Sequence, residues 1–232
     1  MKAIIGGTGF DRMEGLSLMR REVENRYGTV ELFIQTGEEE DLVFLPRHGA
    51  SHSRAPHMIA HRANIQALGD LGVTEAVAIY AVGSISDRLK PGEVGIVGDW
   101  VDFTGRAHTF SDEGQVVHIP CDEPFNPTLQ RRAKTAMPGL PEDLIYVTTL
   151  GPRLETKSEI AFFARQGFDV VGMTLGAEAT LLAEKKIATL ALAYSINWAA
   201  GVGEGKLTFI GDERIEELKG AITQLCRSIL SI

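Results

Sequence analysis

The stretch DVVGMTLGAEATLLAEKKIATLALAYSINW, residues 169–198, decides the fold class of this 232-residue chain. Residues 169–173 form a short apolar run that is typical of a buried strand. A helix is predicted over residues 177–185, and a long apolar strand follows over residues 187–196. Strand, helix and strand in direct succession indicate an α/β protein, in which helices cover a sheet.

The same alternation extends on both sides of this stretch and predicts a single α/β domain over residues 1–232. We expect a three-layer-like arrangement, with a central mixed sheet flanked by helices. Binding loops are expected at the carboxyl ends of the strands, as in open α/β sheets. Further strands are predicted over residues 1–5, 20–25, 29–36, 42–45, 76–82, 94–103 and 144–150, and further helices over 58–71, 127–136, 157–166 and 212–230.

Composition places the chain among ordinary globular enzymes, with 44% hydrophobic and 23% charged residues. The formal net charge of −8 argues against a nucleic-acid partner, because no basic stripe offsets it. No apolar run reaches membrane-spanning length, and the start of the chain lacks the apolar region of a signal peptide. Cys121 and Cys226 are too few for a zinc site of their own and are expected to be reduced thiols. We therefore expect a cytoplasmic protein without a membrane partner.

The glycine-rich segment GGTGF, residues 6–10, directly follows the first strand. Glycines allow a close approach of the backbone to an anion, and the Thr8 hydroxyl adds a donor for phosphate. A dinucleotide fingerprint is the alternative, but Arg12 stands where its third glycine belongs. A simple tight turn is the third interpretation of this segment.

The segment PRHGASH, residues 46–52, brings an arginine and histidines to the end of another strand. Arg47 suits bidentate contact with phosphate, and His48 adds a second donor. A solvated charged loop is the alternative. Arg47 is expected to be dispensable for folding, while His57 and His61 are interpreted as structural.

Three later segments also follow strands: GPRLET at 151–156, GMTLGAEA at 172–179 and YSINWAAG at 194–201. Glu155 is a candidate ligand, although it could instead cap the next helix. Met173 on its own would more often belong to a core than to a site. Asn197 ends a long apolar strand, and its amide can both donate and accept toward a heterocycle.

Taken in order, these segments resemble the trimeric purine nucleoside phosphorylases, a family that includes the methylthioadenosine phosphorylases. The resemblance spans Ile5 to about Gly201. It rests on GGTGF, on PRHG with the later HRANIQALGDLGV, on AVGSI with PGE, on GPRLET, and on GMT followed by residues 177–184. It implies a metal-free and cofactor-free pentosyltransferase of purine salvage, with inorganic phosphate as co-substrate. It also implies a homotrimer or a hexamer of such trimers.

The resemblance further implies a role for each site residue. Arg47, His48 and Asn197 would be the catalytic residues, and Met173 would lie against the ribose. His118 would reach the 5′ end of the nucleoside in a neighbouring subunit, so that sites are shared. The implied phosphate ligands are Thr8, Arg47, His48, Thr174 and Ser84, and the implied nucleoside ligands are Glu155, Met173, Asn197 and His118.

Two departures from the family pattern stand out. Tyr80 replaces a threonine that is often a phosphate ligand, and this puts one wall of the phosphate site in doubt. Gly176-Ala177 replaces a small residue and a proline, which should affect only the start of the helix because proline is an optional first helical residue.

The residues near the base predict a 6-oxopurine substrate. Methylthioadenosine phosphorylases have aspartates at the positions of Asn197 and Ala199, whereas Glu155 matches a glutamate that accepts the N1 proton of 6-oxopurines. Phosphorylases of ordinary inosine commonly have a histidine beyond the purine-binding asparagine, aimed at the 5′-hydroxyl. The matching position lies near Gly211, where the sequence is apolar, and no histidine follows His118. An apolar segment at this position suits a 5′-methylthio group.

We therefore predict an S-methyl-5′-thioinosine phosphorylase. An inosine/guanosine phosphorylase is the next alternative, and a methylthioadenosine phosphorylase is the third. A non-catalytic purine-nucleoside-binding protein and a dinucleotide-dependent oxidoreductase represent different functional classes.

Overall fold

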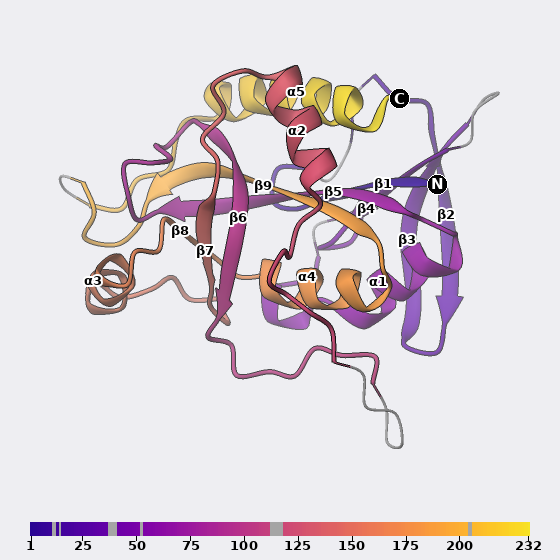
Figure 1. The fold of residues 1–232 in the computed structure, drawn as a ribbon, viewed down its shortest axis with the longest axis horizontal. Coiled ribbons are helices and arrows are strands. Elements are labelled where there is room, and N and C mark those ends of the chain that lie inside the picture. Colours follow the sequence, from indigo (N-terminus) through magenta and orange to yellow (C-terminus); the bar gives the residue numbers. More distant parts are fainter. Residues whose placement is uncertain (11–12, 14, 37–40, 52, 112–117, 204–205) are drawn as a thin grey trace.

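The fold is a nine-stranded mixed sheet with helices on both faces (Figure 1). The computed structural model describes residues 1–10, 13, 15–36, 41–51, 53–111, 118–203 and 206–232. The strands are, in chain order, β1 (Lys2–Gly6), β2 (Leu18–Asn25), β3 (Gly28–Gln35), β4 (Leu42–Pro46), β5 (Glu75–Ser84), β6 (Val94–Asp102), β7 (Leu144–Thr148), β8 (Val170–Gly172) and β9 (Ala188–Trp198). Their spatial order is β2-β3-β4-β1-β5-β8-β7-β6-β9.

The helices form two layers, which confirms the predicted α/β class. Figure 1 shows α2 (Pro127–Ala136) and α5 (Asp212–Leu230) on one face of the sheet, with α1 (His61–Asp70) and α4 (Leu175–Glu184) on the other. A further helix, α3 (Lys157–Arg165), packs beside β7 and β8 through Ile160 and Phe163.

Strand β5 shows why the central strands are apolar throughout. Its residues Ala76, Ala78 and Tyr80 belong to the core beneath α1 and α4. Its alternate residues Val77 and Ile79 belong to the core beneath α2 and α5. Because successive side chains point to opposite faces and both faces are covered, no polar alternation remains in the sequence.

The predicted mixed sheet closes on itself in its second half. One edge of β5 pairs with β1 at residues 75–78 and with β8 at residues 83–84. Its other edge pairs with β9 along nearly its whole length. Strands β8, β7, β6 and β9 then complete a ring back to β5. This closure is possible because β5, with 10 residues, is long enough to pair with different partners along one edge.

Most predicted boundaries differ by only a few residues, and the helices over 127–136 and 212–230 have the predicted bounds. The helix predicted over 58–71 begins only at His61, because Pro56–Met58 form a 3-10 turn and Ile59 is extended. Helix α4 begins at Leu175, two residues before its predicted start. A Cβ on Gly176 would lie 2.6 Å from Oδ2 of Asp102, so the small residue lets the helix start pack against β6.

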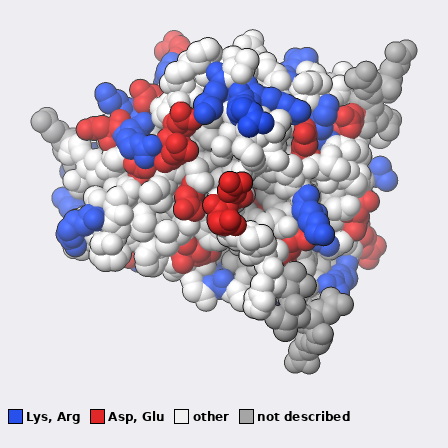
Figure 2. Space-filling model, in the orientation of Figure 1, with Lys and Arg blue, Asp and Glu red and all other residues white. Residues whose placement is uncertain are grey.

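Charged side chains are interspersed over the face shown in Figure 2. The basic side chains over α2 include Arg132 and Lys134, which are paired with Glu75 and Glu142. None of the described helices is long and apolar enough to cross a membrane. Cys121 is exposed and Cys226 is buried, and both are free thiols.

Gly98 tests how closely β6 packs against the chain at the start of β7. The pairing shifts register between Val97 and Asp99, and a Cβ on Gly98 would lie 2.7 Å from Cα of Asp143. Because this neighbour is backbone, Gly98→Ala should destabilise the protein by about 1–3 kcal/mol. Urea unfolding at constant pH measures the change.

Gly220→Ala is the matched control. Gly220 lies exposed in α5, and a Cβ added there would have nothing within 4 Å, so alanine should be neutral or stabilise by up to about 1 kcal/mol. If both variants shift stability equally, Gly98 is not a close-contact position.

Candidate active site

A cavity of about 230 Å³ opens where several strands end. Residues following β1, β4 and β8 line it, together with the last residues of β5 and β9. This is the edge of the sheet at which binding loops were expected. Seven of the predicted site residues line the cavity: Thr8, Arg47, His48, Glu155, Met173, Thr174 and Asn197.

The glycines of the first turn serve the turn itself and the side chain of Arg47. A Cβ on Gly6 would lie 2.1 Å from the carbonyl oxygen of Phe10, and one on Gly7 would lie 2.1 Å from Nη1 of Arg47. Gly9 has a φ of 80°, which favours glycine. The turn therefore needs its glycines before any ligand binds, and it presents Thr8 at the cavity.

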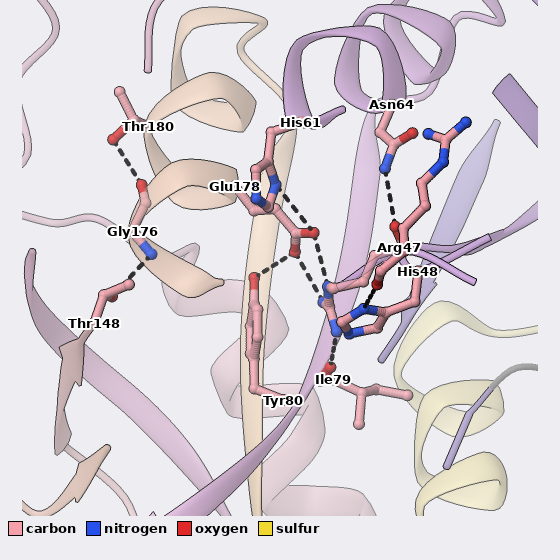
Figure 3. Close-up of polar contacts among 11 residues, drawn as sticks. Arg47, His48, His61, Asn64, Ile79, Tyr80, Thr148, Gly176, Glu178 and Thr180 are labelled. Atoms are coloured by element: carbon pink, nitrogen blue, oxygen red, sulfur yellow. Dashed lines mark hydrogen bonds and ion pairs between the residues drawn. The ribbon is translucent and has the colours of Figure 1, made fainter. Parts of the chain in front are cut away.

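Arg47 forms a buried bidentate ion pair with Glu178 of α4 (Figure 3). Its Nε and Nη2 donate to Oε1 and Oε2 of Glu178, each at 2.8 Å. Its Nη1 donates to the carbonyl oxygen of Ile79 at 2.6 Å. Since a guanidinium has five N–H donors, two remain for a ligand in the cavity that Arg47 lines.

The charges of this cluster are set by burial and by the pair itself. Burial alone would raise the pKa of the fully buried Glu178, but the adjacent Arg47 guanidinium outweighs it, and the pKa is lowered. Burial lowers the pKa of His61 to about 4, against the attraction of Glu178. The cluster at neutral pH therefore holds an ionised pair and a neutral His61.

Glu178 was not among the predicted site residues, although the sequence carried a signal. A glutamate inside the apolar helix LGAEATLLAE has to find a partner, because an unpaired buried carboxylate is costly. The partner itself could not be named from sequence, since Arg47 lies 131 residues earlier.

The His48 ring is held by the loop that follows it. Its Nδ1 lies 2.8 Å from the carbonyl oxygen of Arg54, so Nδ1 carries the proton and donates. The residue is 6% exposed and lines the cavity. His52 of the same segment lies outside the described residues.

Met173 and Thr174 occupy the connection from β8 to α4. Gly151 has a φ of 64°, and a Cβ there would lie 2.4 Å from Sδ of Met173, so this glycine allows the preceding loop to pack on the thioether. Thr174 is the N-cap of α4 but makes no capping hydrogen bond through its side chain. Its hydroxyl and the helix N-terminus therefore suit an anion in the cavity.

Glu155 is not the cap of the next helix, so that alternative is wrong. Thr156 is the N-cap of α3 and forms a capping box with Glu159. Glu155 instead accepts a hydrogen bond at Oε1 from the Thr149 hydroxyl at 2.6 Å. Its second carboxylate oxygen is then available to a donor in the cavity that Glu155 lines.

Asn197 is fixed by a local hydrogen bond at the end of β9. Its Nδ2 donates to the carbonyl oxygen of Trp198 at 2.7 Å, which assigns the orientation of the amide because that oxygen can only accept. Residues 207–210 fold back over this strand end through an Asn197–Phe209 bridge. That return places Leu207 and Phe209 in the cavity wall.

Two of the predicted residues do not line the cavity. Ser84 is completely buried, and its hydroxyl donates to the carbonyl oxygen of Leu89 and lies 2.6 Å from Oγ of Ser195, so its side chain is not a phosphate ligand. The prediction failed because β5 turns this residue into the core. His118 is exposed and is not among the residues that line the cavity of its own chain.

Comparison with known proteins identifies the family. A profile described as the phosphorylase superfamily matches residues 2–232. The chain belongs to this superfamily. It is an enzyme of the nucleoside phosphorylase type, a pentosyltransferase.

Curated relatives of this phosphorylase have three different names. A probable S-methyl-5′-thioinosine phosphorylase of Methanocaldococcus jannaschii is 41% identical, covering 94% of this chain and 86% of the relative. A 6-oxopurine nucleoside phosphorylase of Pyrococcus furiosus is 38% identical, covering 89% and 82%. An S-methyl-5′-thioadenosine phosphorylase of Mycolicibacterium smegmatis is also 38% identical, covering 88% and 80%.

Solved structures share the fold of this phosphorylase over nearly its whole length. A methylthioadenosine phosphorylase from an antarctic soil metagenomic library has a TM-score of 0.88 at 28% identity, covering 99% of this chain and 85% of that one. A methylthioadenosine phosphorylase of Schistosoma mansoni in complex with tubercidin has a TM-score of 0.86 at 26% identity, covering 99% and 90%.

Arg47→Ala is expected to weaken the fold, which corrects the expectation that Arg47 is dispensable for folding. The substitution leaves the Glu178 carboxylate buried without its counter-charge, and this should cost about 3–5 kcal/mol of unfolding free energy. Chemical denaturation at neutral pH measures the loss.

Arg153→Ala is the control for this measurement. Arg153 also forms a bidentate ion pair, with Glu159 at 2.7 and 2.9 Å, but this pair lies on the surface. Solvent weakens such a pair, so stability should change little. A small loss in both variants would show that the buried pair does not hold the fold.

Proposed function

We propose that this phosphorylase uses inorganic phosphate to cleave S-methyl-5′-thioinosine, a 6-oxopurine nucleoside, into hypoxanthine and 5-methylthioribose 1-phosphate. The observation that carries the proposal is that Glu155 and Asn197 line the same cavity as Arg47, His48 and Thr174. The cavity thus offers base ligands together with anion donors. No metal or cofactor is required by this chemistry.

The names of the relatives alone do not choose the base. The thioinosine, 6-oxopurine and thioadenosine enzymes are 41%, 38% and 38% identical to this chain. Because these identities are so similar, they do not indicate which base this phosphorylase binds. The residues that would contact the purine have to be considered instead.

In the proposed reaction an oxygen of hydrogen phosphate forms a bond to C1′ of the sugar as the C1′–N9 bond breaks. The bonding electrons leave with the purine, which takes up at N7 the proton that the phosphate loses. Arg47, His48, Thr8 and Thr174 would hold phosphate beneath C1′, which contributes to the rate through prior orientation. The phosphate charge also offsets the positive charge that develops on the sugar. Asn197 would stabilise the leaving purine at N7.

The hydrogen-bonding pattern of the base ligands favours a 6-oxopurine. With one Nδ2–H on Trp198, Asn197 keeps Oδ1 to accept from a protonated N7 and a second Nδ2–H to donate to O6. Glu155, held by Thr149, would accept the N1 proton, which adenine lacks. Each mispaired contact with adenine would cost about 1–3 kcal/mol.

The wall beside Asn197 favours a 5′-methylthio group over a 5′-hydroxyl. Leu207 and Phe209 line the cavity and offer no hydrogen bond through their side chains, and no histidine follows His118 in the sequence.

Inosine or guanosine phosphorolysis is the second candidate function, because Glu155 and Asn197 would bind the same bases. Methylthioadenosine is third. A non-catalytic nucleoside-binding protein would have no use for anion donors such as His48 and Thr174 beside the base ligands.

The test of this function is a base-release assay with purified protein. Methylthioinosine, inosine, guanosine and methylthioadenosine are each incubated with and without phosphate, and free base is measured by chromatography. We expect phosphate-dependent release, with the highest kcat/KM for methylthioinosine. Purine binding without release of base from any of the four would support the binding protein instead.

Asn197→Asp should shift the base preference away from 6-oxopurines. An ionised carboxylate can only accept, so it would repel O6 and would also lose the bond to the Trp198 carbonyl. We expect kcat/KM for methylthioinosine to fall about tenfold or more, with only a partial gain on methylthioadenosine because Glu155 remains. The ratio of kcat/KM for the two nucleosides measures the shift.

The phosphate KM is the internal control for Asn197→Asp and should change little. Adding Ala199→Asp restores the second acidic position of methylthioadenosine phosphorylases and should increase the gain on that substrate. An unmoved ratio in the single variant, or a wild type that prefers methylthioadenosine, would refute the assignment of Asn197.

We further propose a homotrimer, or a hexamer built from trimers, in the cytoplasm, with His118 completing the site of a neighbouring subunit. Exposed His118 and the exposed aromatic side chains of Phe103 and Phe162 support an interface between subunits.

Sedimentation equilibrium should give about three or six times the 25.2 kDa chain mass. His118→Ala should raise the nucleoside KM and leave the phosphate KM unchanged. A fully active monomer would contradict a shared site.

A further inference from the structure

We propose that Tyr80 is a positioning residue for Arg47: it holds the Arg47–Glu178 pair in place and thereby strengthens phosphate binding, although it does not touch phosphate. The inference rests on the proposed function, in which Arg47 binds phosphate. It assigns a role to the position at which a family-typical threonine ligand is missing.

The side chain of Tyr80 faces away from the cavity. It is 2% exposed, it belongs to the core beneath α1 and α4, and it is not among the residues lining the cavity. Its ring packs edge-to-face on Tyr146, with centroids 5.8 Å apart. A hydroxyl in this place cannot replace a threonine hydroxyl as a phosphate donor.

Tyr80 instead contacts both members of the ion pair (Figure 3). Its hydroxyl donates to Oε2 of Glu178 at 3.0 Å. Its ring lies under the guanidinium, with Cζ of Arg47 4.5 Å from the centroid. Burial raises the pKa of Tyr80, so the hydroxyl stays protonated and remains a donor.

The contacts restrict Arg47 on several sides while it still lines the cavity. Glu178 holds two of its nitrogen atoms, the Ile79 carbonyl holds the third, Gly7 leaves room for Nη1, and the Tyr80 ring covers one face. A long side chain that is already ordered loses little conformational freedom when it binds a ligand. Tyr80 therefore supports phosphate affinity by keeping the carboxylate, and through it the guanidinium, in one orientation.

The experiment measures binding of inorganic phosphate by titration calorimetry to the wild type, Tyr80→Phe and Tyr146→Phe. Tyr80→Phe keeps the ring and removes only the hydroxyl. We expect it to raise the phosphate Kd about five- to tenfold, because a hydrogen bond to an ionised group is lost. The phosphate KM should rise in parallel, while the nucleoside KM stays unchanged.

Tyr146→Phe is the matched control. Tyr146 is equally buried in the same core, and its hydroxyl faces the backbone of Thr174 and Leu175 but makes no hydrogen bond to Arg47 or Glu178. The variant should weaken phosphate binding clearly less than Tyr80→Phe does, and this difference isolates the contact of Tyr80 with Glu178. Thermal melts of all three proteins fix a temperature at which each is folded, which separates a change in binding from a loss of folded protein.

A double-mutant cycle tests the route of the effect. In a Glu178→Gln background Tyr80 has lost its ionised partner, so adding Tyr80→Phe should change the phosphate Kd less than about twofold. Full additivity of the two substitutions would show that Tyr80 does not act through Glu178 and would overturn the inference.

The outcomes distinguish this inference from the proposed function. Phosphate binding that weakens in Tyr80→Phe, without cleavage of any nucleoside by the wild type, would refute the function and support the positioning role. Wild-type phosphate affinity in Tyr80→Phe, an equal loss in Tyr146→Phe, or no phosphate binding by the wild type would each overturn the positioning role.

Discussion

The buried ion pair of Arg47 and Glu178 is the interaction on which the site depends. It joins the end of β4 to α4 across 131 residues of sequence, and both side chains are almost completely buried. Two charges removed from water are stable only when their geometry and remaining hydrogen bonds are satisfied. The turn after β1, the middle of β5 and the start of α4 must therefore be placed together. The pair thus constrains how four elements of the fold meet.

Closure of the sheet brings the proposed phosphate ligands and the proposed base ligands together. Strand β5 carries β1 and β8 along one edge and β9 along the other, so the ends of β1, β8 and β9 converge around residues 81–83. Thr8 follows β1 and Thr174 follows β8, whereas Asn197 lies at the end of β9. In an open sheet of this strand number the same residues would be spread along an edge.

Two of the site side chains use one hydrogen bond to the protein and keep another for a ligand: Glu155 is anchored on the Thr149 hydroxyl and Asn197 on the Trp198 carbonyl. The ring of His48 is held by the Arg54 carbonyl. Such anchoring fixes the direction of each group before a ligand arrives, which is the basis of electrostatic preorganisation. In the proposed function, this anchoring is the reason why the single residue at position 197 should influence which base is accepted.

The sequence by itself determined the α/β class, the bounds of two helices and the set of polar residues delivered at strand ends. These features depend on local signals: apolar periodicity, caps such as Asn126 with Pro127, and a polar residue that directly follows an apolar run. Seven predicted side chains consequently line one cavity, because the ends of neighbouring strands meet. Only the tertiary structure decided that Glu178 pairs with Arg47, that Ser84 turns into the core, that Glu155 bonds Thr149 rather than capping a helix, and that the sheet closes. The physical reason is that each of these outcomes depends on which groups become neighbours once the helices pack on the sheet. Local sequence signals do not show which groups will meet, whether they are distant or adjacent in sequence.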